Sequence, residues 1–322
     1  MHSEFYLACE SAMFEDVPKE EQFPAQSPVL AHYTTVATLE KIVRNDELWL
    51  SHPFHMNDQE ELRWGLDEGV RVFQTHPSLL KACGDESRFH LLLQDFNRRS
   101  FEFTSVHAAN IYVACFCMHD ARDKDGILSM WRGYGANGGG VAIIIDTSKL
   151  GTIDNSPFVL HSITYLSKAK RYQWIDQTIK KVADLIEKYK PSDDELWKAG
   201  AHFFERLKLF ALFTKHEGFS EEKEWRLAYL GDRDGDRKFH DKLSYLVTEK
   251  GVVPKLKLKI APNEGFDDPE LSMSRITHSI LLGPALTAPL TKLAVERLLV
   301  AADKTDLSKK VSVSSIPFRA SY

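Results

Sequence analysis

Two glutamates separated by one residue, Glu222 and Glu224, stand at the start of a run, 222–230, that the sequence predicts as a strand. Because alternate residues of a strand point to the same face, both carboxylates and Arg226 are expected side by side. Carboxylates in this arrangement can stabilise positive charge that develops on a sugar, or accept a proton from an attacking group. Arg226 can pair with a phosphate or with either carboxylate. The alternative for this segment is a solvated strand edge that carries no chemistry.

Three further segments place polar side chains inside, or at the ends of, apolar elements. They are Ala31-His32-Tyr33-Thr34-Thr35, the stretch 50–61 with Ser51 and Asn57, and the stretch 129–135 with Trp131, Arg132 and Tyr134, which runs into 140–143. Taken singly, each has a structural alternative: His32 can be a hydrogen-bonded core histidine and Trp131 a core residue. Aromatic rings such as Tyr33, Trp131 and Tyr134 can also stack on a planar ligand.

Two other patterns carry no functional prediction. Residues 133–138 fit G-x-G-x-x-G, but a dinucleotide fingerprint follows a strand and opens a helix, whereas these glycines precede the predicted strand 141–146. We expect a tight loop at which a backbone or a ligand comes close. His52, His55 and Asp58 match no well-defined set of metal ligands, so we expect solvated loop histidines and predict no metal site.

The elements that must hold these residues are strands grouped around a helical insert. Strands are predicted near 29–33, 47–51, 111–117, 140–146, 158–166, 222–230, 252–260, 275–283 and 310–316. The segment 171–214 reads as two helices divided by Pro191. Too many aromatic residues for a solvated helix occur there, so we expect a packed subdomain around Trp197, Phe203, Phe204, Phe210 and Phe213. This grouping predicts an α+β fold, because a regular βαβ alternation is missing.

Composition limits the class of protein but not its reaction. Hydrophobic residues make up 43% of the 322 residues, and the net charge of −5 argues against a protein-wide footprint on nucleic acid. No apolar run reaches the ~20 residues that span a bilayer, and the acidic start is unlike a signal peptide. The four cysteines lack a disulfide spacing, so we expect reduced thiols in a soluble, cytoplasmic protein. We predict an irregular acidic lead-in over 1–28 and a single α+β domain over 29–322 with a helical subdomain at about 171–214.

Taken in order, the four polar segments resemble the bacterial domain-of-unknown-function 2971 family. The motifs of that family resemble, in chain order, H-Y-T near the start, L-S-x-P-x-x-x-N-D-x-x-E, M-W-x-x-Y-x-x-x-x-x-G-V-x-I and K-x-x-x-W-x-x-E-x-E-W-R. The resemblance covers about residues 30–285. The chain departs from the pattern at Phe219, where Trp is usual, and at Glu221, where Tyr is frequent, and neither departure touches Glu222 or Glu224.

The H-Y-T opening, followed by a helix, a short strand and Ser51, is similar to the start of ADP-ribosyltransferase-like proteins, among them DNA-targeting bacterial toxins and RNA 2′-phosphotransferases. This resemblance implies an ADP-ribosyltransferase-like split β-sheet core with a helical insertion. It also implies NAD as substrate, a first-strand His that hydrogen-bonds a ribose, and a late-strand catalytic Glu. Glu224 is then catalytic at the ribose, and Glu222 at the acceptor. The residues implied to bind NAD are His32, Tyr33, Thr34, Ser51, Asn57, Trp131, Arg132, Tyr134 and Arg226.

The leading hypothesis is an NAD-dependent ADP-ribosyltransferase-like enzyme, such as a bacterial toxin or phage-defence effector. It would cleave the nicotinamide–ribose bond and transfer ADP-ribose to a protein or nucleic-acid acceptor, and an NAD glycohydrolase is a close variant. Two other classes stay open: a non-catalytic nucleotide-binding sensor or adaptor, and a metal-dependent nucleic-acid enzyme that uses Asn57, Asp58 and Glu60. The residues expected to converge on one cleft are His32, Ser51, Trp131, Tyr134 and Glu224.

Overall fold

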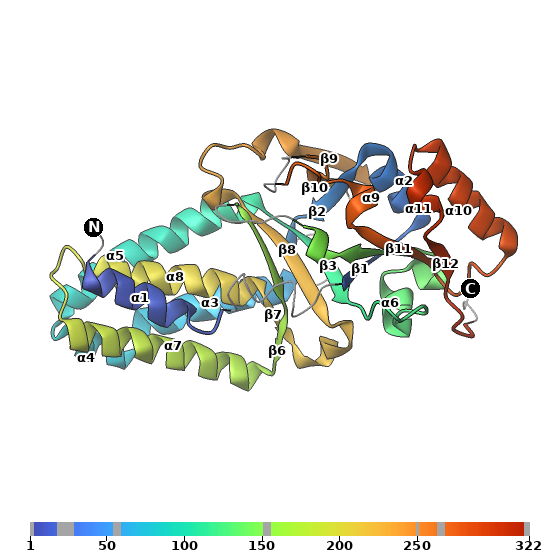
Figure 1. The fold of residues 1–322 in the computed structure, drawn as a ribbon. Coiled ribbons are helices and arrows are strands. Elements are labelled where there is room, and N and C mark those ends of the chain that lie inside the picture. The colour runs from blue at the N-terminus through green and yellow to red at the C-terminus, as the bar shows by residue number, and fades with distance from the viewer. Residues whose placement is uncertain are drawn as a thin grey trace. The chain divides into compact units, whose positions relative to one another are not determined.

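Packed helices and one short pair of strands form the first of two compact units, which is made of residues 1–19, 53–110 and 163–219 (Figure 1). The computed structural model describes residues 3–17, 29–53, 59–150, 156–248, 251–262 and 268–318. The helical unit contains α1 (Glu4–Phe14), α3 (Gln59–Thr75), α4 (Pro77–Cys83), α5 (Glu86–Glu102), the π-helix η3 (Phe103–His107), α7 (Lys168–Tyr189), α8 (Trp197–Leu212) and the parallel pair β6 (Thr164–Leu166) and β7 (Thr214–His216). In these described ranges, no helix is both long and apolar enough to cross a membrane.

Aromatic side chains form the centre of the helical unit. Phe73 of α3 stacks on Phe96 of α5 and on Phe203 of α8, with ring centroids 4.1 and 4.6 Å apart. Trp174 of α7 stacks on Phe210 with centroids 3.7 Å apart. Among the rings that predicted a packed subdomain, Trp197 is 37% exposed and the others are buried: Phe203, Phe204, Phe210 and Phe213. The expected packing is therefore confirmed except at Trp197.

The N-terminal segment is helical, so the predicted irregular lead-in over 1–28 is wrong for residues 4–14. Ser3 caps the helix, because its hydroxyl accepts a hydrogen bond from the backbone N–H of the third residue beyond it. Phe5, Cys9 and Met13 form a buried stripe at four-residue spacing. Most of the residues between these positions are themselves apolar, so the sequence alone does not single out the stripe. Part of the predicted lead-in, 18–28, lies outside the described residues.

A mixed sheet forms the second unit, made of residues 20–52, 111–162 and 220–322. Its strands are β1 (Val29–Thr34), β2 (Glu47–Ser51), β3 (Ile111–Met118), β4 (Val141–Asp146), β5 (Phe158–Ser162), β8 (Glu224–Leu230), β9 (Leu243–Thr248), β10 (Gly251–Lys259), β11 (Thr277–Leu282) and β12 (Val311–Val313). Its helices are α2 (Val36–Asn45), α6 (Leu128–Gly133), α9 (Met273–Ile276), α10 (Pro289–Ala301) and α11 (Thr305–Ser308). The strand order is β12-β11-β4-β1-β3-β2-β10-β9, and β8 pairs with both β3 and β5. The predicted α+β class is confirmed.

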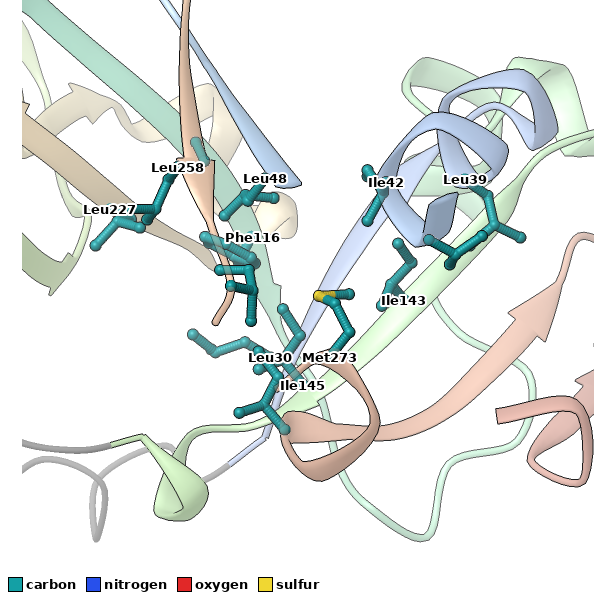
Figure 2. Close-up of a cluster of buried hydrophobic side chains, with 14 of the residues drawn as sticks. Leu30, Leu39, Ile42, Leu48, Phe116, Ile143, Ile145, Leu227, Leu258 and Met273 are labelled. Carbon is teal, nitrogen blue, oxygen red and sulfur yellow. The ribbon is translucent and has the colours of Figure 1, made fainter. Parts of the chain in front are cut away.

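Two apolar clusters pack on opposite faces of this sheet. The large cluster includes Leu30, Phe116 and Leu227 together with side chains of α2, β2, β4, β10 and α9 (Figure 2). The small cluster includes Ala31 and Cys117 together with side chains of β4 and α6. Successive residues of β1 and of β3 therefore face opposite ways, as the pleat of a strand requires.

The glycine-rich loop before β4 lets two backbone segments touch, so the predicted tight loop is confirmed. The N–H of Gly283 donates to the carbonyl of Gly140 at 2.9 Å, and the N–H of Ala285 donates to the carbonyl of Gly138 at 3.0 Å. Gly138 has a φ of +84°, and a methyl group on Gly140 would lie 2.3 Å from the carbonyl oxygen of Thr34. The glycines are needed for this backbone contact, and the loop precedes a strand instead of opening a helix.

Gly140→Ala is expected to lower the free energy of unfolding by about 2 kcal/mol or more, because the added methyl group would push β1 and β4 apart. Gly133→Ala is the matched control in α6, where nothing lies within 4 Å of the added atom. This control should be neutral, or more stable by up to about 1 kcal/mol, because alanine favours a helix. Urea unfolding measures both, and equal stabilities would contradict the importance of the close approach.

Candidate functional site

Two strands share one edge of β3 and separate from each other along it. β8 pairs with the opposite edge of β3, along Ile111 to Cys117. On the shared edge, Ala31 of β1 pairs with Cys117, and Ser51 of β2 pairs with Val113. The sheet therefore splits beside Cys115, between the two pairings. This split and the strands around it form the candidate site.

His32 contacts the backbone of β3 at the split. Its Nδ1 lies 2.9 Å from the carbonyl oxygen of Cys115, and because a carbonyl only accepts, Nδ1 carries the proton. Burial lowers the pKa of His32 below its ordinary value of 6.5, the hydrogen bond to Cys115 opposes this change, and the charge of Lys255 adds to it. The neutral ring leaves Nε2 as an acceptor, which is the form that can accept a hydrogen bond from a ribose hydroxyl.

Ser51 and Lys255 form a second polar pair at the split, and the sequence analysis missed Lys255. The two residues are register partners on β2 and β10, and Nζ of Lys255 donates to Oγ of Ser51 at 2.5 Å. Burial lowers the pKa of Lys255 below its ordinary value of 10.5. The signal that could have identified it is the alternation of Lys255, Lys257 and Lys259 with apolar residues in one strand.

The candidate catalytic residue Glu224 is one half of a buried ion pair. It is 5% exposed and its partner Arg226 is 7% exposed. Nε of Arg226 donates to Oε1 of Glu224 at 2.6 Å, and Nη2 donates to Oε2 at 3.3 Å. The predicted shared face of these two residues is confirmed. Glu224 is the register partner of Cys117 on β3, and Arg226 is the partner of His161 on β5.

Glu222 does not share this strand face, so that part of the prediction is wrong. The 3-10 helix η7 (Glu217–Glu222) ends at Glu222, and β8 begins only at Glu224. Lys223 between them has a φ of +44°, which interrupts the alternation of strand residues. The carboxylate of Glu222 instead accepts a hydrogen bond from the hydroxyl of Tyr134 at 2.9 Å. The structure therefore joins Glu222 to another predicted site residue.

Tyr33 and Trp131 are buried in the small cluster, where their rings meet edge to face with centroids 4.9 Å apart. The hydroxyl of Tyr33 accepts from the N–H of Ile127 at 2.9 Å, and Nε1 of Trp131 donates to the carbonyl of Asp125 at 2.8 Å. Because both polar groups are hydrogen-bonded and both rings are buried, this geometry favours the structural alternative over stacking on a ligand.

Of the remaining predicted binding residues, Thr34 and Arg132 lie apart from the split. Thr34 ends β1 and pairs with Val141 of β4. The guanidinium carbon of Arg132 lies 5.7 Å from the ring centre of Phe318. Asn57 lies outside the described residues.

In the described ranges, no three His, Cys, Asp or Glu side chains gather closely enough to hold a metal ion. His52 is buried against the ring edge of Tyr112, so the expected solvated loop histidine is wrong at this position. Its ring packs on β3 because it directly follows β2. His55 and Asp58 lie outside the described residues.

The expected convergence of the site residues on one cleft is wrong for His32 and Glu224. Ala31, Cys117 and Glu224 are successive cross-strand partners, so they point to the same face of the sheet. His32 follows Ala31 and points to the opposite face. Ser51 pairs with a β3 residue four positions from Cys117, so it shares the face of Glu224. One face thus carries Ser51 and Glu224, and His32 reaches the split from the other.

Glu224→Gln is expected to lower the free energy of unfolding by about 3 kcal/mol, because the buried guanidinium of Arg226 loses the charged partner on its own strand. Glu222→Gln is the matched control. The same substitution at a carboxylate that accepts from Tyr134 should cost less than about 1 kcal/mol. Urea unfolding compares the two, and a Glu224→Gln protein as stable as the wild type would show that the ion pair adds no stability.

Acidification is expected to destabilise the wild type more than a His32→Gln variant. Since the pKa of His32 is lower in the folded protein than its ordinary 6.5, the unfolded chain binds the proton more readily. The stabilising contribution is therefore present above about pH 6.5 and is lost as pH falls through that value towards the folded pKa. Melting temperatures between about pH 8 and pH 5 measure the effect, and parallel curves for the two proteins would contradict it.

Residues 130–227 match the sequence model of a protein family of unknown function, DUF2971. The match contains Trp131, Tyr134, Glu224 and Arg226, and the segments with His32 and Ser51 precede it. No curated protein and no solved structure matches the chain. The resemblance to the DUF2971 family that the order of polar segments predicts is thus confirmed over residues 130–227.

Proposed function

We propose that the sheet of the second unit binds NAD and cleaves its nicotinamide–ribose bond, as an ADP-ribosyltransferase-like enzyme. The observation that carries the proposal is the shared face of Ser51 and Glu224, with β3 between their strands. Two strand spacings and four residues along β3 separate them, roughly 17 Å between backbone positions. One extended dinucleotide can bridge a span of this size.

Glu224 suits the ribose end of such a ligand. Cleavage of the nicotinamide–ribose bond builds positive charge on the ribose, and nicotinamide leaves as a neutral molecule with the bonding electrons. A carboxylate held in place and away from water stabilises that charge strongly. Arg226 fixes the position of the Glu224 carboxylate through two hydrogen bonds, so little reorganisation is needed during the reaction.

The acceptor end of the reaction falls to Glu222 in this proposal. Its carboxylate accepts a hydrogen bond from Tyr134, which is 39% exposed and hence accessible to an incoming molecule. A carboxylate at the surface can orient an acceptor hydroxyl or amine and take its proton. The different environments of Glu222 and Glu224 support two different roles.

A non-catalytic nucleotide-binding protein is the second candidate, and the ion pair of Glu224 with Arg226 favours it. The guanidinium already compensates the charge of Glu224, so the carboxylate would stabilise a ribosyl cation less than an unpaired one. A protein of this class would bind NAD at the same face and release no nicotinamide.

Glu224→Asp is expected to reduce nicotinamide release from NAD by about a hundredfold, because the shorter side chain withdraws the carboxylate by more than about 1 Å. It keeps a negative charge beside Arg226, so its melting temperature should fall less than that of Glu224→Gln. Measured nicotinamide release and melting temperature separate catalysis from folding. An aspartate variant with wild-type turnover would remove Glu224 from the reaction.

Glu222→Gln serves as the functional control in the same assay. With labelled NAD, it should impair transfer to added proteins or nucleic acids more than it impairs hydrolysis of NAD. Saturable NAD binding by the wild type, without nicotinamide release, would replace the enzyme proposal with the binding alternative.

A further inference from the structure

Lys255 brings a positive charge to the split that no acid neutralises within the part of the chain that the structure describes. Its ammonium has three N–H donors, and the hydrogen bond to Ser51 uses one of them. No described carboxylate lies at ion-pair distance from it. The side chain is half-buried, so the charge loses hydration without gaining a partner of opposite sign.

The two other lysines on this face of β10 are placed differently. The ammonium of Lys257 lies 4.9 Å from the ring centre of Trp49, and Lys259 donates to a backbone carbonyl. Glu47, the only acid in the facing row of β2, accepts from Nε1 of Trp49. Lys257 and Lys259 thus have a ring and a carbonyl as partners, while Lys255 is paired with a hydroxyl at the split.

A serine hydroxyl next to an ammonium is suited to an anionic oxygen. The hydroxyl of Ser51 accepts from Lys255 and still has its own hydrogen to donate. Hydrogen bonds from an ammonium to phosphate oxygens are charge-assisted and about twice as strong as neutral ones.

We propose that Lys255 and Ser51 bind the diphosphate of the dinucleotide at the split. The choice of ligand rests on the proposed function, since the diphosphate belongs to its substrate. With the diphosphate at Ser51, the nicotinamide ribose extends along the same face of β3 towards Glu224. Lys255 is a binding and positioning residue in this arrangement and takes no part in bond cleavage.

Calorimetric titration with ADP-ribose tests the proposal without turnover, because ADP-ribose keeps the diphosphate and lacks the scissile nicotinamide bond. Lys255→Gln is expected to weaken its binding about ten- to hundredfold, and Ser51→Ala about three- to tenfold. Adenosine, which has no phosphate, should bind all variants equally. Lys259→Gln is the matched control, since it removes the same charge from the same face of the same strand, and its effect should stay below about threefold.

Thermal unfolding of Lys255→Gln distinguishes a binding role from a structural one. Removing a half-buried charge with no acid partner should leave the melting temperature unchanged or raise it, whereas a structural hydrogen bond would lower it. A clear fall in melting temperature together with unchanged ADP-ribose affinity would overturn the proposal.

The remaining outcomes separate this inference from the proposed function. A wild type that does not bind ADP-ribose, or equal losses in Lys255→Gln and Lys259→Gln, would overturn the diphosphate site. Binding that depends on Lys255 in a protein that releases no nicotinamide would support the site and remove the catalytic proposal. NAD cleavage with an unchanged KM in Lys255→Gln would remove the site and leave the enzyme.

Discussion

A hydrogen bond from a side chain to a strand edge holds the sheet together where its regular ladder stops. One edge of β3 pairs with β8. On the other edge, β1 pairs with Cys117 on one side of Cys115, and β2 pairs with Val113 on the other side. A buried carbonyl without a donor is costly, and the Nδ1–H of His32 satisfies it. This contact fixes the tautomer of His32 and leaves Ser51 at the border of the split.

Charge is distributed unequally over the face of the sheet that carries the candidate site. At one end Arg226 compensates Glu224 within a buried pair, and such a pair contributes little stability compared with apolar residues of the same volume. At the other end Lys255 has no acid partner among the described residues. A cation without an acid partner at one end of this face, and a compensated pair at the other, attract an anion to the cation end. In the proposed complex, this asymmetry would give the dinucleotide a preferred direction along β3.

Local sequence patterns predicted the features that depend on residues close together in the chain, such as strand faces and the packing of helices. The alternation of a strand placed Glu224 and Arg226 on one face, and helical spacing with many aromatic rings predicted the packing around Phe203. The alternation rule failed at Glu222, because Lys223 adopts a positive φ, which is not expected of a lysine. The helix at Glu4–Phe14 was missed because apolar residues lie on all of its sides, so no single stripe with helical spacing stands out.

Features that depend on distant pairings could not be read from the sequence. Lys255 borders the site only because β10 pairs with β2, about two hundred residues earlier in the chain. The split exists because two strands share one edge of β3, and no local pattern specifies that choice. The order of the polar segments along the chain was more informative than any one segment, since it predicted the family that matches residues 130–227.

The opposite orientations of His32 and Glu224 restrict how any single ligand can use both. In an unbroken sheet the backbone would separate side chains on the two faces, because hydrogen-bonded strands about 4.8 Å apart leave no passage between them. Beside Cys115 the ladder is interrupted, and the ring of His32 lies at that interruption. A ligand on the face of Glu224 can therefore meet His32 only at the split. The divergence of β1 and β2 removes ladder hydrogen bonds from the sheet, and in the proposed complex it would be what lets residues of both faces serve one site.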